Sequence, residues 1–565
     1  MSPVIGSGTN GQHSIPSGST YYYDLATIPP HLIDREISRQ EKTLSTFRTK
    51  RNAYFSKVRI PNEMLSEIFR HCAIEDYYHD SKRCGVKRPI LLTLTSVCRL
   101  WRHAALDCAG IWSYIHTMSP RWTEEFLIRS RMIPLKIRIK GSTRTADVVR
   151  KSLEKVMNHV ERIQVLNLDI PDIPGFSLGR LLHAPRLQTL KIWVNPPAVT
   201  SVVFFGATIP ALRILRLKGC SVPWYNFGSN GLTTLSLEGL PIHFQPDVEE
   251  FLEIISCMQN LTQLDLDHSL PGSQTFIHSA AFNTFQKVQL PKLSRLDIEA
   301  TLPTVIAFLS CVNVPLGAEV RLKCCSRDFP FHDGDDSDDT LLPSLLAQRF
   351  TVSEDRTLPS PTIRSLVVEF TGLGPRLTFS TSERDCDSCV DKTDMWDCNI
   401  PLQVLLDYSE SDVDLDQIIN TTCSAVPLTH VRSVHIVQLP LDSVFWKRTL
   451  TRLPELRYLK LSESRMPALA HALLADPHDL VGGDDGERDE DEAQNRMFAP
   501  ALEELELYRI TFARRRYEYD LGPLITDLRS LKRALHLRKG PEIKVTLIEC
   551  DQITLPDDGY ISEEI

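Results

Sequence analysis

The sequence predicts an α/β protein in which a small, all-helical module precedes a long solenoid of parallel β-strands. Two observations carry this prediction. The pattern L-x-x-L-x-L recurs about a dozen times after residue 135, and residues 60–105 instead place apolar side chains at the three- and four-residue spacing of helices. The chain has 565 residues, more than one hydrophobic core usually serves, so its length predicts about three or four units or one long array of repeats.

Composition and charge exclude several classes of protein. Hydrophobic residues make up 42% of the chain and charged residues 24%, as in soluble globular proteins. The net charge of −9 argues against a general nucleic-acid binder, which would carry a basic excess. We find neither a secretory signal nor a run of roughly 18 apolar residues that could span a membrane. We therefore expect no membrane partner, a cytoplasmic and/or nuclear location, and reduced thiols for the 14 cysteines.

The first two segments differ in character. Residues 1–30 are rich in Gly, Ser, Thr and Pro, so we expect a disordered tail. A G-x-G-x-x-G match at residues 6–11 has no strand before it, as a dinucleotide site would require. Residues 31–58 place apolar side chains at alternating spacings of four and three, which predicts an amphipathic helix with a coiled-coil-like seam. We favour packing of this helix on its own protein, and dimerisation is the alternative.

Residues 60–72, IPNEMLSEIFRHC, predict the first helix of the module. Pro61 suits a first helical turn, where its missing N–H would have had no partner. Positions 61, 65, 68, 69 and 72 then fall on one face. After a polar linker, a second apolar set recurs at helical spacing and predicts another helix: Leu94, Val97, Cys98, Trp101 and Ala105. So short a segment has a small core, and apolar side chains left on one side favour an obligate partner.

Three pieces follow one another in a fixed order: P-x-E-x-L-x-x-I-F, V-C-R-x-W-R and a closing tryptophan. This segment, residues 59–118, resembles an F-box, and the layout with repeats behind it is similar to the expanded F-box families of mushroom-forming (basidiomycete) fungi. The resemblance implies a three-helix module that binds a Skp-type adaptor and, through it, a cullin. Carried over by position, the adaptor-contacting residues would be Pro61, Leu65, Ile68, Phe69, Val97, Cys98, Trp101 and Trp112.

The repeats occupy the rest of the chain. The central apolar residues of the six clearest copies stand at 166, 190, 215, 235, 264 and 296, so the steps are 24, 25, 20, 29 and 32 residues. This spacing is typical of leucine-rich repeats, each a strand plus a return segment. We therefore predict an irregular leucine-rich-repeat-like solenoid over residues 119–555, with acidic loop insertions near 331–339 and 479–492 and an acidic tail at 556–565.

The polar residues of these strands predict a charged surface. In each copy the second and third apolar residues face the core, and the residues between them alternate to the exposed side. These are basic in the early repeats, at Lys191, Arg216 and Lys218, and acidic in the next three. The surface is either an ordinary solvated face or a binding site for a protein target with a basic segment. The candidate target-binding residues, which with Glu238 form the acidic stripe, are Asp265, Asp267, Asp297 and Glu299.

Catalytic motifs are missing from the sequence, which has no HExxH, GxSxG or Walker loop. The C-x-x-C pair Cys386 and Cys389, with Cys398 nearby, lacks a recognisable fourth zinc ligand, and free thiols are the alternative. Cys324 and Cys325 end a predicted strand, and we expect them to pack rather than ligate. We therefore expect no catalytic residue, cofactor or metal.

Together these observations lead us to interpret the chain as a non-catalytic substrate receptor of an SCF-type cullin–RING ubiquitin ligase, which recruits an unidentified protein target. The alternative is a non-degradative F-box and repeat scaffold for protein assembly.

Overall fold

The computed structural model describes residues 29–55, 60–78, 88–171, 184–194, 209–220, 231–240, 245–271, 287–325, 342–347, 362–371, 374–382, 401–407, 415–439, 446, 449, 452–463, 499–510, 535 and 542–550. Both predicted acidic insertions, the acidic tail, residues 1–28 and the C-x-x-C cysteines lie outside these residues. The chain divides into two compact units, Met1–Cys72 with Ile90–Cys108 and Ala73–Pro89 with Ala109–Ile565. Among the described helices, none is both long enough and apolar enough to cross a bilayer.

Helix α1 (Pro30–Phe55) occupies most of the segment predicted to be an amphipathic helix. An ion pair between Glu36 and Arg39 (2.8 Å) lies on its surface. The seam side chains Ile37, Leu44 and Phe47 are 50%, 51% and 66% exposed. Among the described residues, these three seam side chains are therefore open to solvent, and packing of the helix on its own protein, with dimerisation as the alternative, stays a prediction.

Helix α2 (Asn62–Tyr78) follows Pro61 and buries Leu65 and Phe69 completely. Phe69 meets the Trp101 ring edge-on, with 5.3 Å between the ring centroids. Trp101 belongs to α4 (Arg99–Asp107), and the short α3 (Ile90–Leu94) precedes it. Part of the apolar face that we read along α2 thus packs against α4.

The single helix predicted from Leu94 to Ala105 is wrong, because two helices meet there. The hydroxyls of Thr95 and Ser96 donate to the Leu92 carbonyl at 3.0 and 2.7 Å. Such bonds compete with the helical backbone ladder and end α3. Cys98 is extended (φ −157°, ψ 172°) and stands at the N-cap of α4. The hydroxyl residues between the apolar positions were the signal for this break.

The second unit contains a 16-stranded sheet within the described residues. Its strands lie side by side in this order: β1 (Tyr114–His116), β2 (Leu135–Lys140), β3 (Ile163–Ile170), β4 (Thr189–Val194), β5 (Ile214–Lys218), β6 (Thr234–Glu238), β7 (Gln263–Asp267), β9 (Arg295–Thr301), β11 (Glu319–Cys325), β14 (Leu402–Asp407), β13 (Gly374–Ser380), β12 (Ser365–Thr371), β15 (Ser433–Val437), β16 (Tyr458–Ser462), β17 (Glu504–Tyr508) and β18 (Lys544–Ile548). Because β1 already pairs with β2, the segment 59–118 is not wholly helical as predicted.

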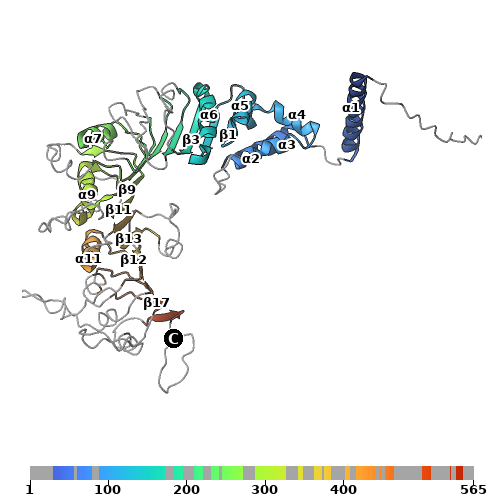
Figure 1. Cartoon of the computed structure of the whole chain (residues 1–565). Helices are drawn as coiled ribbons and strands as arrows, with labels where there is room; N and C mark the ends of the chain where they lie inside the picture. The colour runs from blue at the N-terminus through green and yellow to red at the C-terminus, as the bar shows by residue number, and fades with distance from the viewer. Residues whose placement is uncertain are drawn as a thin grey trace, which may run out of the picture. The chain divides into compact units, whose positions relative to one another are not determined.

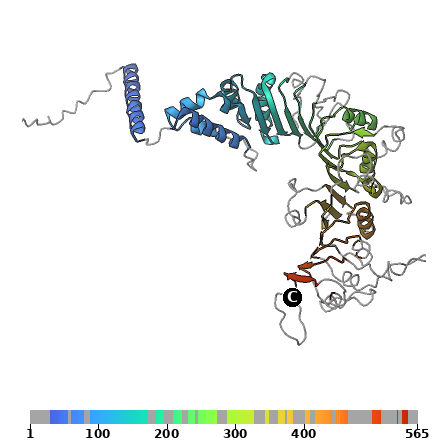
Figure 2. The same cartoon turned by 180° about the vertical axis from the view of Figure 1, so that it is seen from behind.

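Helices follow several strands of this unit and cover one side of the sheet. They are α5 (Pro120–Arg129), α6 (Ala146–Met157), α7 (Val248–Ser256), α9 (Leu302–Cys311) and α11 (Leu415–Ala425). Short 3₁₀ turns lie at η2 (Ala109–Ser113), η3 (Thr143–Thr145) and η4 (Val160–Arg162), and β8 (Val288–Gln289) pairs with β10 (Val312–Asn313). Opposite views show α7, α9 and α11 on the same side of the strands (Figure 1, Figure 2). We call the other side the open face.

The register of the sheet confirms the predicted direction of the apolar residues. The six central leucines of the clearest copies are direct neighbours across adjacent strands: Leu166, Leu190, Leu215, Leu235, Leu264 and Leu296. Each is at most 1% exposed. Burial of a leucine contributes about 2 kcal/mol, so this row is a continuous source of stability along the sheet.

Several strands are followed by a residue with a positive φ, and in each case its N–H makes the same kind of backbone hydrogen bond. Gly219, Gly239 and His268 have φ values of 63°, 61° and 45°. Their N–H groups donate to Glu238, Asp267 and Glu299 carbonyls of the next strand at 2.9, 2.8 and 2.7 Å. Gln438, Glu463 and Arg509 repeat the conformation farther along. This turn fixes the side chain that follows each of these strands at the same end of the sheet.

The sheet is not parallel throughout, which corrects the predicted all-parallel array. β13 runs antiparallel to both β12 and β14, and this reversed group separates β11 from β15. Glu369 of β12 and Arg376 of β13 are cross-strand partners, and an ion pair of 2.8 Å joins their side chains. Burial raises the pKa of the Glu369 carboxyl, and Arg376 opposes that shift. The ion pair with Arg376 therefore offsets the cost of burying the Glu369 carboxylate, and it stabilises the antiparallel pairing of β12 with β13.

Arg376→Ala should destabilise the fold by about 3 kcal/mol at neutral pH, because it leaves a buried carboxylate without its partner. A carboxyl whose pKa is raised by folding costs stability as the pH rises above the unfolded value of about 4.3. The loss should therefore shrink when the pH falls below about 4, where Glu369 is protonated in both states. Urea unfolding at neutral pH and below about pH 4 measures this difference, with Arg376→Lys as the control that keeps the positive charge. An equal loss of stability at both pH values would contradict the prediction.

Candidate functional site

The eight motif residues expected to contact an adaptor separate by burial. Pro61, Ile68 and Val97 are exposed, the last two by 42% and 56%. Cys98 and Trp101 are half-buried. Leu65, Phe69 and Trp112 are 0% exposed. In this arrangement the three fully buried residues support the fold, and the exposed residues are the ones that a partner protein can reach.

Trp112 belongs to the second unit, whereas the other seven motif residues belong to the first. Its ring meets Phe126 edge-on, with 4.9 Å between centroids, and the Arg129 guanidinium lies 4.6 Å from its centre. Sequence reasoning missed Met64 and Leu100, which are 57% and 49% exposed. The four-residue step from Met64 to Ile68 on α2 was the available signal, since side chains at that spacing share a helix face.

The open face of the sheet carries two rows of charged side chains. The outer row crosses β5, β6, β7, β9 and β11 through neighbouring residues Lys218, Glu238, Asp267, Glu299 and Lys323. The inner row joins Lys191, Arg216, Ser236, Asp265, Asp297 and Arg321. The predicted basic and acidic residues are thus brought together as neighbouring groups. Arg321 and Lys323, which sequence reasoning missed, bound the acidic stripe on its far side.

Burial disfavours the charged forms of the acidic residues on the open face, and likewise those of the neighbouring basic residues. Loss of hydration raises the pKa of Asp267 to about 6, and the neighbouring Glu299 carboxylate adds to this shift. Burial likewise raises the pKa of Asp297 to about 6, and the like charge of the neighbouring Asp265 adds to this shift. On the basic side, burial and then Arg216 lower the pKa of Lys191. A ligand of opposite charge would relieve either group.

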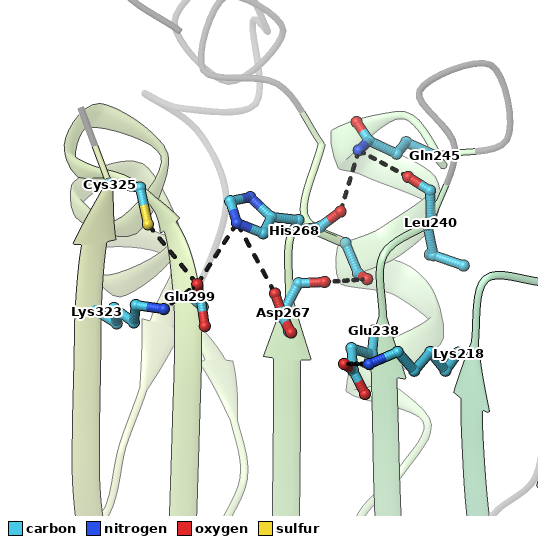
Figure 3. A network of polar contacts seen from close by, with 10 residues as sticks. Lys218, Glu238, Leu240, Gln245, Asp267, His268, Glu299, Lys323 and Cys325 are labelled. Carbon is cyan, nitrogen blue, oxygen red and sulfur yellow. Dashed lines mark hydrogen bonds and ion pairs between the residues drawn. The ribbon is translucent and has the colours of Figure 1, made fainter. Parts of the chain in front are cut away.

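A second feature lies where β7, β9 and β11 end (Figure 3). The imidazole Nε2 of His268 is 3.6 Å from Glu299 Oε1 and 3.9 Å from Asp267 Oδ1. Glu299 also pairs with Lys323, and the Cys325 thiol lies 3.9 Å from Glu299 Oε1. Figure 3 shows His268 between Glu299 and Asp267, with the Cys325 sulfur turned toward Glu299. We call His268, Glu299 and Cys325 the strand-end cluster.

The protonation of this cluster follows from its contacts. Hydrogen bonding to His268 lowers the pKa of Glu299 to about 2, and Lys323 contributes in the same direction. Hydrogen bonds to Cys325 and then Glu299 raise the pKa of His268 to about 10. The Gln245 amide donates to the His268 carbonyl at 3.4 Å and steadies the turn. A thiol, an imidazole and a carboxylate therefore meet at one edge of the sheet.

Comparison with protein-family models and with curated proteins gives no match for this chain. No protein-family model matches the chain. No curated protein matches it either. The motif residues, their exposure and the charges of the open face are therefore the features of this chain that bear on its function.

Proposed function

We propose that this chain is a non-catalytic substrate receptor of an SCF-type cullin–RING ubiquitin ligase. In this proposal residues 59–118 are an F-box that docks a Skp-type adaptor, and the sheet behind them is a leucine-rich-repeat-like array that holds a protein target. The observation that carries the proposal is the ordered motif P-x-E-x-L-x-x-I-F, V-C-R-x-W-R and tryptophan, two of whose apolar residues, Ile68 and Val97, are exposed.

Docking of the adaptor is favoured by apolar side chains that this chain leaves in water. Met64 and Ile68 share one face of α2, and Val97 and Leu100 flank the start of α4. Apolar anchors of this kind supply most of the energy of a protein interface when they enter pockets of a partner. Leu65 and Phe69 pack beneath the exposed residues of α2, and so hold that surface in one shape.

Recruitment of a target is favoured by the acidic stripe on the open face. Asp265, Asp267, Asp297 and Glu299 come from two neighbouring strands and lie opposite one another in register. The raised pKa values of Asp267 and Asp297 indicate that their negative charges lack full compensation. A basic segment of a target protein would supply that compensation, and opposed charges also speed and orient association.

Proximity labelling distinguishes a receptor from a scaffold. The intact chain and an Ile68→Asp/Val97→Asp variant are each fused to a labelling enzyme and expressed in cells. A receptor predicts at least one labelled partner whose abundance rises with the variant, because the link to the ligase is cut. Ile128→Asp/Met132→Asp, which changes exposed apolar residues outside the motif, should behave as the intact chain. If the adaptor is labelled but no partner accumulates, the scaffold is the better account.

A further inference from the structure

The strand-end cluster brings together three kinds of metal ligand from three adjacent strands. His268 follows β7, Glu299 lies in β9, and Cys325 is the last residue of β11. Their ligating atoms all lie within 4.8 Å of one another. Along β11, Cys325 alternates with Cys324 and shares the open face with Lys323. The expectation that both cysteines only pack is therefore open to revision for Cys325.

We propose that His268, Glu299 and Cys325 bind a divalent transition-metal ion of the zinc type. Bonds of about 2.0–2.3 Å in a tetrahedron place ligand atoms roughly 3.3–3.8 Å apart. The cluster already shows 3.6 Å from His268 Nε2 to Glu299 Oε1 and 3.9 Å from Cys325 Sγ to the same oxygen. Small side-chain movements would complete the geometry.

The donor set selects the class of metal. Thiolate, imidazole and carboxylate together suit zinc and its neighbours in the first transition row. Magnesium and calcium instead prefer oxygen ligands alone. The thiolate and the Glu299 carboxylate would balance the double positive charge of the ion. Three protein ligands leave a fourth position for water or for a donor from a bound partner.

Two groups must move for the metal to enter. The Lys323 ammonium contacts Glu299 Oε1 and would have to leave that oxygen. Its side chain is 33% exposed, so it can turn toward solvent. The imidazole of His268 must lose its proton, as metal binding generally requires of its ligands. The His268 side chain is 51% exposed, which gives its ring room to approach the ion.

This site is independent of adaptor docking, since it uses residues of the second unit only. A bound ion would tie the ends of β7, β9 and β11 together beside the acidic stripe. The ion would enter as two protons leave, one from the His268 imidazole and one from the Cys325 thiol, so the net charge beside Asp267, whose carboxylate lies 3.9 Å from His268 Nε2, would stay the same. The metal would therefore stabilise the proposed target surface without changing its net charge.

Cobalt(II) is a suitable probe, because it occupies zinc sites and a bound thiolate adds a charge-transfer band in the near ultraviolet. The experiment uses the full chain without a histidine tag and with Cys386, Cys389 and Cys398 replaced by serine. This background removes the C-x-x-C thiols as competing ligands. We expect one equivalent of cobalt with the thiolate band, which zinc then displaces because a tetrahedral site with a thiolate ligand suits zinc.

Variants assign the ligands. Cys325→Ser should abolish the band and weaken binding by about 100-fold or more, as expected for the loss of a thiolate ligand. Cys324→Ser, whose thiol points to the core side, should leave the band unchanged. His268→Asn should also weaken binding without unfolding, because asparagine tolerates the left-handed backbone there. No band in the parent chain, or a band that survives Cys325→Ser, would overturn the proposal.

Discussion

Simultaneous replacement of Ile68 and Val97 by aspartate is expected to weaken binding of a Skp-type adaptor roughly 100-fold or more. Both side chains are exposed at motif positions, so the change removes two apolar anchors without opening the core of the first unit. Two carboxylates would also be driven into an interface that offers them no partner, which adds to the loss. Titration of purified adaptor by calorimetry measures the effect.

Two results identify the origin of that loss. Circular dichroism should show the variant folded, because its substituted side chains are 42% and 56% exposed in the parent. Ile128→Asp/Met132→Asp introduces the same charges at apolar residues that are 66% and 70% exposed, and should retain the parent affinity. Equal losses in both double variants would mean that charge, and not the motif surface, governs adaptor binding.

Trp112→Ala is expected to destabilise the second unit by about 3–5 kcal/mol. The side chain is fully buried, and its removal leaves a cavity between Phe126 and Arg129. Because Trp112 does not reach the surface, the adaptor affinity of the folded fraction should change little. Urea unfolding measures the free energy of unfolding, and a separate calorimetric titration of the folded variant measures its affinity for the adaptor.

Trp193→Ala is the matched control for this experiment. Trp193 stands on the open face and is 37% exposed, so its loss should cost less than about 1 kcal/mol. If Trp112→Ala instead left stability unchanged and abolished adaptor binding, the closing tryptophan would be a direct contact and the burial argument would fail.

Sequence periodicity predicted the sheet well, because apolar and polar side chains alternate with a period of two in every clear copy. The six central leucines read from the sequence all fall in one buried row, from Leu166 to Leu296. The same alternation placed Asp265 and Asp297 beside one another on the open face. The apolar pattern alone sufficed to predict these six strands, since each buries one side and pairs with the strand of the next repeat.

The apolar pattern failed where the structure depends on a distant part of the chain or on the hydrogen bonds of polar side chains. The apolar spacing of α2 could not distinguish Leu65 and Phe69, which are buried, from Ile68, which is exposed, because all three share one broad helical face. The antiparallel β13 was missed because its direction depends on the route of the chain around it. The break at Thr95 arises from local hydroxyl bonds that apolar periodicity ignores.

The strand-end cluster illustrates the same limit. His268, Glu299 and Cys325 stand in three separate repeats and form no recognisable motif. Their adjacency follows only from the register that pairs Glu299 with both Asp267 and Lys323, together with the left-handed turn at His268. Once the strand order is known, the meeting of these side chains at one edge can be derived.

The most direct test of the receptor proposal is a calorimetric titration of the intact chain with a purified Skp-type adaptor. The proposal predicts a one-to-one complex with a dissociation constant of about 1 μM or below, equivalent to about −8 kcal/mol. Binding should disappear with Ile68→Asp/Val97→Asp and persist with Ile128→Asp/Met132→Asp. A folded intact chain that gives no binding with adaptor in the range of about 100 μM would contradict the central claim.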